Sequence, residues 1–196
     1  MGAIFCSPPK TADYVSLEVY TGYNTALGGG KRQWYCPWAL PSTYMPTSDY
    51  DVRATYEWNA ETRQIALTNT SRSHDGHEKV IHGIAWLDPN YDQSSHSKLL
   101  VEFNFSEYIG TWLPLNLPPA HYWILMVAPD DQYRYAVVSS PCRTSLFILS
   151  AEPVLATEDL IETRQRLVAE FGFTKYTVGR LHSYYRGPTT TAPGSY

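Results

Sequence analysis

A run of eight strand-like segments between residues 33 and 150 constrains the fold most strongly. Each segment is rich in β-branched and aromatic residues, and turn-forming residues such as His74-Asp75-Gly76 and Asp88-Pro89-Asn90 separate neighbouring segments. No ten-residue helical stretch interrupts them, which excludes a parallel βαβ architecture. The chain is therefore predicted to be all-β, an eight-stranded antiparallel up-and-down barrel. The predicted strands are 33–41, 51–58, 63–70, 79–87, 97–105, 121–128, 133–139 and 144–150.

One α-helix is predicted after the strands, packed outside the barrel. Thr157 is expected to be its N-cap and Gly172 to end it. A last short strand is predicted over 176–184. The expected apolar stripe of the helix is Leu160, Ile161, Leu167, Val168 and Phe171.

The chain divides into three parts. Residues 1–30 are expected to form an N-terminal arm that packs through 13–24 and ends in the flexible loop Gly28-Gly29-Gly30. Residues 31–186 form the barrel with its helix, and 187–196 are expected to be a disordered tail.

Composition excludes several classes of protein. Among 196 residues only 17% are charged and the net charge is −4, which gives no basic surface for nucleic acid. No apolar run approaches the ~20 residues of a membrane span, and Pro8-Pro9 cuts short any secretory signal. Three widely spread cysteines argue against a secreted disulfide framework. We expect an intracellular protein, cytoplasmic or peripheral to a membrane.

The first residues allow two interpretations. Gly2 followed by a small residue at position 6 fits an N-myristoylation signal if the host is a eukaryote, and Cys6 is then a candidate for palmitoylation. Two acyl chains anchor a protein stably where one does not. The alternative is an ordinary unstructured start.

Strand alternation predicts which side chains face the interior of the barrel. Ala54, Tyr56 and Trp58 share one face of their strand, and Leu99, Val101 and Phe103 share one face of theirs. The interior of an eight-stranded barrel is either filled by side chains or holds one small ligand. The pattern leaves both options open.

The segment from Asp51 to Arg186 resembles the lipocalin family. The matching stretches are VRATYEW (52–58), HGIAWLDP (82–89), SKLLVEFNF (97–105), HYWILMVAP (121–129) and YRYAVVSSPCRTSLFILS (133–150). Two features depart from the family. Lipocalins begin their first strand with Gly-x-Trp, whereas this chain has Arg32-Gln33-Trp34. The family's Arg that packs over this Trp is replaced by Ser150-Ala151-Glu152, so the usual closed-end contact is not expected.

The resemblance implies a calyx that binds a fatty acid, lysolipid, sterol or similar hydrophobic molecule. In relatives, aromatics on the second and last strands touch the ligand, and Tyr56 and Phe147 match them. Whether Tyr122 or Trp123 points inward stays open. The expected ligand contacts are Ala54, Tyr56, Trp58, Leu99, Val101, Phe103, Trp123, Phe147 and Leu149.

The connection over 106–119 is unusually apolar and, in lipocalin topology, lies at the open mouth. Its apolar side chains must meet a membrane interface, a second subunit in a homodimer, a ligand that they cover as a lid, or the barrel itself. They are Ile109, Trp112, Leu113, Leu115 and Leu117.

Catalytic and metal chemistry receive little support. The cluster His74, Asp75, His77, Glu78 and His82 enters a strand from a turn, so no metal site and no cofactor are predicted. A disulfide between Cys36 and Cys142 is not expected either. A cofactor-free cyclase of the Diels–Alder type survives as the alternative function, because it requires only a shaped apolar pocket and hydrogen-bond donors. The candidate donors are Tyr56, His121 and Tyr122.

Overall fold

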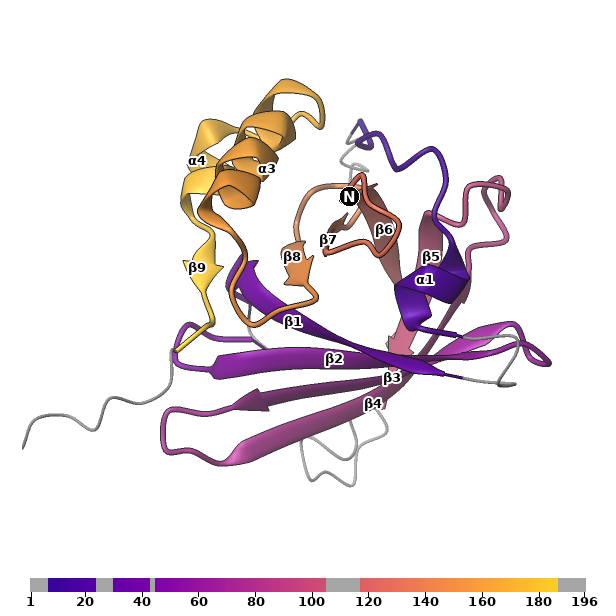
Figure 1. Ribbon diagram of the computed structural model, residues 1–196, viewed down its shortest axis with the longest axis horizontal. Coiled ribbons are helices and arrows are strands. Elements are labelled where there is room, and N and C mark those ends of the chain that lie inside the picture. Colours follow the sequence, from indigo (N-terminus) through magenta and orange to yellow (C-terminus); the bar gives the residue numbers. More distant parts are fainter. Residues whose placement is uncertain (1–6, 24–29, 43–44, 105–116, 187–196) are drawn as a thin grey trace, which may run out of the picture.

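The computed structural model describes residues 7–23, 30–42, 45–104 and 117–186, and these form a closed antiparallel barrel (Figure 1). Neighbouring strands follow the order β2-β3-β4-β5-β6-β7-β8-β1, and β1 closes the barrel by pairing with β2. The eight-stranded up-and-down prediction is therefore confirmed. The strands are β1 (Lys31–Ala39), β2 (Tyr50–Asn59), β3 (Gln64–Arg72), β4 (Glu78–Leu87), β5 (Lys98–Phe103), β6 (Ala120–Val127), β7 (Tyr135–Ser139) and β8 (Leu146–Ser150).

The interior face of the barrel is set by strand register. Tyr56 on β2 lies opposite Leu67 on β3, and Ala54 lies opposite Asn69, which in turn lies opposite Ile81 on β4. Residues directly opposite in such pairs point to the same face of the sheet. A register shift between Ile124 and Met126 in β6 breaks the alternation there, so that Ile124 packs inside the barrel and Leu125 and Met126 outside.

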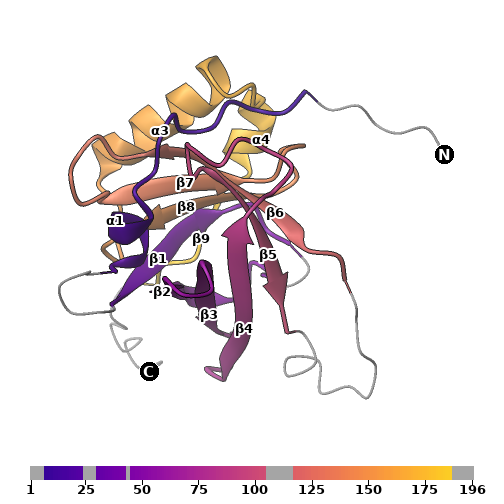
Figure 2. The ribbon, with the colours of Figure 1, turned by 90° about the vertical axis from the view of Figure 1, so that its right-hand side faces the viewer.

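A second hydrophobic core lies outside the barrel, between β6–β8 and two helices, α3 (Thr157–Ala169) and α4 (Lys175–Gly179) (Figure 2). Leu167 and Phe171 are buried in it and Leu160 and Val168 pack at its edge, but Ile161 is 52% exposed. The predicted stripe is therefore one residue too wide. The N-cap is Ala156 rather than Thr157, with no side-chain capping bond.

The predicted strand over 176–184 is mostly wrong. Its first half belongs to α4, which the Thr174 hydroxyl caps by accepting a hydrogen bond from the Thr177 amide. Only His182–Ser183 (β9) is a strand, and it pairs with β1. Local capping thus outweighs the β-branched residues in this segment.

The N-terminal arm packs across one end of the barrel through α1 (Leu17–Thr21). Val15, Leu17 and Tyr20 are buried in the inner core. The helix ends at Gly22, whose φ of 71° favours glycine and where an added Cβ would lie 2.9 Å from the Lys31 carbonyl oxygen. This tight turn directs the chain toward β1.

Several expectations fall outside the described residues, namely those on Gly2, Cys6, Gly28–Gly29 and the 187–196 tail. Of the helices that the structure describes, none has the length and apolar character needed to cross a bilayer.

Candidate functional site

A cavity of about 170 Å³ opens inside the barrel. Its walls are largely apolar, and the strands contribute them by the alternation expected for a half-buried sheet. The apolar wall residues are Cys36, Met45, Val52, Ala54, Leu67, Ile81, Val101, Phe103, Ala120, Val138, Phe147 and Leu149.

Three tyrosine hydroxyls form the floor of the cavity. The Tyr122 hydroxyl lies 2.6 Å from that of Tyr20 and 2.9 Å from that of Tyr56. Tyr56 and Tyr122 line the cavity, while Tyr20 reaches the floor from α1 and lines a small void of about 10 Å³ beneath it. Two hydrogen bonds among three hydroxyls use two protons, so one O–H remains as a donor.

Burial keeps these groups neutral at ordinary pH. It raises the pKa of Tyr20, Tyr56 and Tyr122 well above that of a free tyrosine. The free thiol of Cys36 in the wall is also buried, and burial raises its pKa to about 12. The inner part of the site therefore offers neutral hydrogen-bond donors in apolar surroundings.

The closed end beneath the floor departs from our expectation in an informative way. A guanidinium does pack on Trp34, but it comes from Arg32, whose Cζ lies 4.0 Å from the ring centroid. Arg32 also donates hydrogen bonds to the carbonyls of Val19 and Tyr133, 2.9 Å each, and the Trp34 indole donates to the Tyr20 carbonyl. The residue that replaces the family's glycine thus supplies the cation, and it fixes α1 in place.

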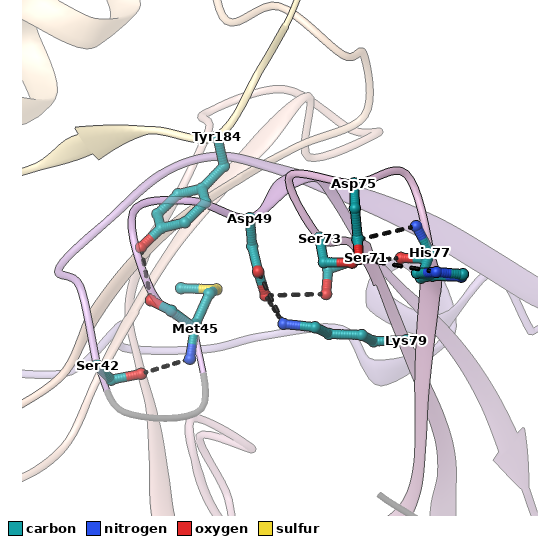
Figure 3. Close-up of polar contacts among 9 residues, drawn as sticks. All are labelled: Ser42, Met45, Asp49, Ser71, Ser73, Asp75, His77, Lys79 and Tyr184. Atoms are coloured by element: carbon teal, nitrogen blue, oxygen red, sulfur yellow. Dashed lines mark hydrogen bonds and ion pairs between the residues drawn. The ribbon is translucent and has the colours of Figure 1, made fainter.

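The mouth is bordered by residues 45–49, by the end of β3 and by the start of β4 (Figure 3). Asp49 is 2% exposed, and its carboxylate oxygens accept hydrogen bonds of 2.8 and 2.9 Å from Lys79. The Tyr184 hydroxyl donates to the Met45 carbonyl at 2.8 Å. The short segment over the mouth is thus held by one part-buried ion pair and one buried hydrogen bond.

The basic side chains of the cavity lining lie beside carboxylates. Lys79 pairs with Asp49, and the Arg53 guanidinium lies 3.5 Å from Asp51 and 3.6 Å from Glu78. His121 lies 3.2 Å from the fully buried Asp88, and its ring meets Trp123 edge-on.

Most of the predicted ligand contacts line the cavity, namely Ala54, Tyr56, Val101, Phe103, Phe147 and Leu149. Leu99 lies lower, in the wall of the void beneath the floor. Trp58 packs at the edge of the inner core and lines neither space.

The choice between Tyr122 and Trp123 is resolved by the register of β6. Tyr122 points inward, whereas Trp123 lies in the outer core and does not line the cavity. His121 lies at the cavity edge, but its imidazole shares the outer face with Trp123. Of the three candidate donors, Tyr56 and Tyr122 are therefore brought together and His121 is not.

Sequence reasoning missed several residues of the site. Tyr20, Cys36 and Asn69 are among the missed residues that carry polar groups. Gly83 lies outside the lining but beside Phe103, and a Cβ there would lie 2.5 Å from the Glu102 carbonyl oxygen and 2.8 Å from the Phe103 ring. Strand alternation could have placed Cys36 two positions after Trp34, and Asn69 two after Leu67. No local pattern shows that Tyr20, on a short helix, reaches the same point.

The remaining predicted features lie at the surface or outside the described residues. His74, Asp75, His77 and Glu78 are exposed on the β3–β4 turn, and the Asp75 carboxylate accepts a hydrogen bond from Ser73 (Figure 3). Within the described ranges, no group of three or more potential ligands is placed to hold a metal ion. Cys142 is disulfide-bonded, and Cys36 is a free thiol. Ile109, Trp112, Leu113 and Leu115 lie outside the described residues, while Leu117 is 52% exposed.

Comparison with known proteins agrees with this architecture. Residues 30–183 match the lipocalin-like domain family. The chain is 30% identical over 182 residues to temperature-induced lipocalin-1 of Arabidopsis thaliana, covering 90% of this chain and 89% of that protein. In three dimensions it is similar to lobster apocrustacyanin A1, with a TM-score of 0.61, 16% identity and coverage of 96% and 94% of the two chains. It is also similar to insecticyanin from the tobacco hornworm Manduca sexta, with a TM-score of 0.59, 14% identity and coverage of 92% and 91%. The family match, the relative and the closed barrel with its open calyx together establish that this chain belongs to the lipocalin family.

Proposed function

We propose that the protein binds a small amphiphilic molecule, such as a fatty acid, lysolipid or sterol, inside the calyx. The observation that carries this proposal is an apolar cavity whose floor presents the hydroxyls of Tyr56 and Tyr122. Apolar walls supply affinity at about 25 cal/mol per Å² removed from water, and a few polar groups orient the ligand.

Filling the cavity tests the proposal. Ala54 lines it, so Ala54→Phe should weaken binding of the uncharged fluorescent dye Nile red at least tenfold. Ala66→Phe is the matched control, since Ala66 is exposed on the neighbouring strand β3. Equal dye binding by the two variants, or no dye binding by the wild type, would overturn the proposal.

A cofactor-independent cyclase is the second candidate function. The observation that favours it is the spare hydroxyl proton on the apolar floor, because such a donor stabilises charge that develops on a substrate oxygen. Incubation with reactive polyketide or terpenoid precursors should then give product faster with the wild type than with Tyr56→Phe/Tyr122→Phe, which removes both donors of the floor that line the cavity. Equal rates would leave only the binding function.

Peripheral membrane contact is a separate part of the proposal, as is dimerisation through the same surface. It is supported by the apolar sequence of 106–119 and by the exposed side chain of Leu117. Sedimentation with phosphatidylcholine vesicles should fall for Leu117→Glu, and size-exclusion chromatography of the same pair reports the dimer. Acylation at Gly2 would appear as added mass on the intact protein from its own host.

A further inference from the structure

We infer that the calyx selects an uncharged lipid with two oxygen functions, one accepting a hydrogen bond from the tyrosine floor and one a hydroxyl that donates to Asn69. This inference rests on the proposed function and narrows its ligand class. It rests on the pairing of the charged groups, on the spare proton of the floor, and on an unpartnered oxygen in the wall.

The cations of the lining already face carboxylates that compensate their charge, although the buried Nε of Arg53 has no hydrogen-bond partner within the described residues. Lys79 contacts Asp49 through both carboxylate oxygens, and Arg53 faces Asp51 and Glu78. The void beneath the floor is lined only by aromatic and aliphatic residues. Arg32 lies beyond the floor, with its guanidinium bound to two carbonyls. A buried anion without a partner is strongly unfavourable, so an uncharged molecule fits this cavity better.

The floor calls for an acceptor. When Tyr20 donates to Tyr122, the spare proton lies on Tyr56 or Tyr122, and both of these line the cavity. A ketone, alcohol or ester oxygen at the inner end of the ligand would accept it.

Asn69 calls for a donor. Its Oδ1 is shielded from solvent and has no hydrogen-bond partner within the part of the chain that the structure describes. Asn69 lines the cavity from β3, opposite Ala54 on one side and Ile81 on the other. A buried carbonyl oxygen between apolar neighbours is unfavourable until something donates to it.

The two polar points lie at different depths. Asn69 is two residues nearer the mouth than Leu67, which lies opposite Tyr56, and two residues of a strand span ~7 Å. The ligand therefore carries its second oxygen at a fixed distance from the first. A requirement for this spacing would make the calyx prefer lipids with two oxygens at that distance over other lipids of the same length.

Competition against Nile red tests the inference with probes of one chain length. These are dodecanol, dodecanoic acid, and a series of dodecanediols with the second hydroxyl at successive carbons. In the wild type at neutral pH, dodecanol should bind more tightly than dodecanoate. For one diol, the ratio of its affinity to that of dodecanol should be about tenfold higher in the wild type than in Asn69→Leu. Comparing ratios between variants cancels the differences in water solubility among the probes.

Matched variants assign the two contacts. Asn69→Leu should abolish the advantage of the favoured diol. The double variant Tyr56→Phe/Tyr122→Phe removes both floor donors that line the cavity, so it should weaken dodecanol about tenfold. Thr55→Leu and Tyr35→Phe, on strands β2 and β1 but absent from the cavity lining, should change neither. Asn69→Val, with a side chain suited to a strand, serves if the leucine variant does not fold.

The outcomes separate this inference from the proposed function. Tight binding of dodecanoate at neutral pH, or an unchanged diol-to-alcohol ratio in the Asn69 variants, overturns the inference and leaves the calyx as a general binder. Failure of every probe and of Nile red overturns both.

Discussion

Cys36 shows what the interior does to a single side chain. Its thiol lines the cavity, and burial raises its pKa to about 12. Because the thiolate is the reactive form of cysteine, this residue combines a position in the ligand site with chemical inertness.

We therefore predict that Cys36 resists iodoacetamide in the native protein at pH 8 and reacts readily once the protein is unfolded in guanidinium chloride. Peptide mapping by mass spectrometry measures the modification at Cys36. Rapid alkylation under native conditions would contradict the buried position. Bound Nile red should further lower the rate at which small uncharged reagents modify Cys36, because the dye occupies the cavity.

Arg32 makes a similar point about reading motifs. The sequence shows that Arg32 stands where the family has the glycine of Gly-x-Trp, but not that Arg32 itself packs on Trp34. Arg32 and Trp34 are two apart on one strand face, and this spacing brings them together. The function of a lost motif can thus be preserved by a residue next to it.

At the scale of elements, the strands and their order can be predicted from residue alternation and turn-forming residues. The register shift in β6 and the short helix over 175–179 cannot. The register shift in β6 decided between Tyr122 and Trp123, and no residue pattern marks it. The 175–179 helix was missed because its stability depends on a cap and on packing of Val178 in the outer core.

The contact between α1 and β1 yields a prediction on Arg32. Arg32→Leu removes two hydrogen bonds to carbonyls and the contact with the Trp34 ring. It should lower the free energy of unfolding by about 1–3 kcal/mol and speed amide hydrogen exchange in 15–21. Urea unfolding and hydrogen exchange measure the two effects.

Lys31→Leu is the matched control, because Lys31 is the exposed neighbour of Arg32 in β1. It should leave both quantities nearly unchanged. If Arg32→Leu exchanges no faster than this control, Arg32 does not hold the arm.

The ion pair at the mouth yields another prediction. Lys79→Met leaves the Asp49 carboxylate buried without its partner, so the free energy of unfolding should fall by about 1–3 kcal/mol, with Lys79 itself partly exposed. Adding Asp49→Asn should recover much of the loss, because it removes the buried charge. A double-mutant cycle by urea unfolding checks this, and equal losses in the single and double variants would contradict it.

At the scale of the whole molecule, the tyrosine floor joins three parts of the chain: the arm, β2 and β6. Burial raises the pKa values of all three of its hydroxyls above the usual tyrosine value of about 10. Folding therefore favours their neutral forms, and the unfolded chain ionises first as the pH rises.

The sign gives a pH window. The stability that these groups contribute should be constant below about pH 10 and fall above it, as the unfolded state loses protons that the native state keeps. Urea unfolding at stepwise alkaline pH measures it. The variant Tyr20→Phe/Tyr56→Phe/Tyr122→Phe should show a shallower fall, and an equally steep one would assign the pH dependence to other groups.

The floor also has a consequence for how the cavity can change. Its deepest hydroxyl belongs to Tyr20, which lies on a helix that precedes the barrel and pairs with no strand. The depth and polarity of the calyx are thus set partly by a segment that the sheet does not need for closure. Substitutions within residues 17–21 would therefore change the bottom of the cavity without altering a strand of the barrel wall.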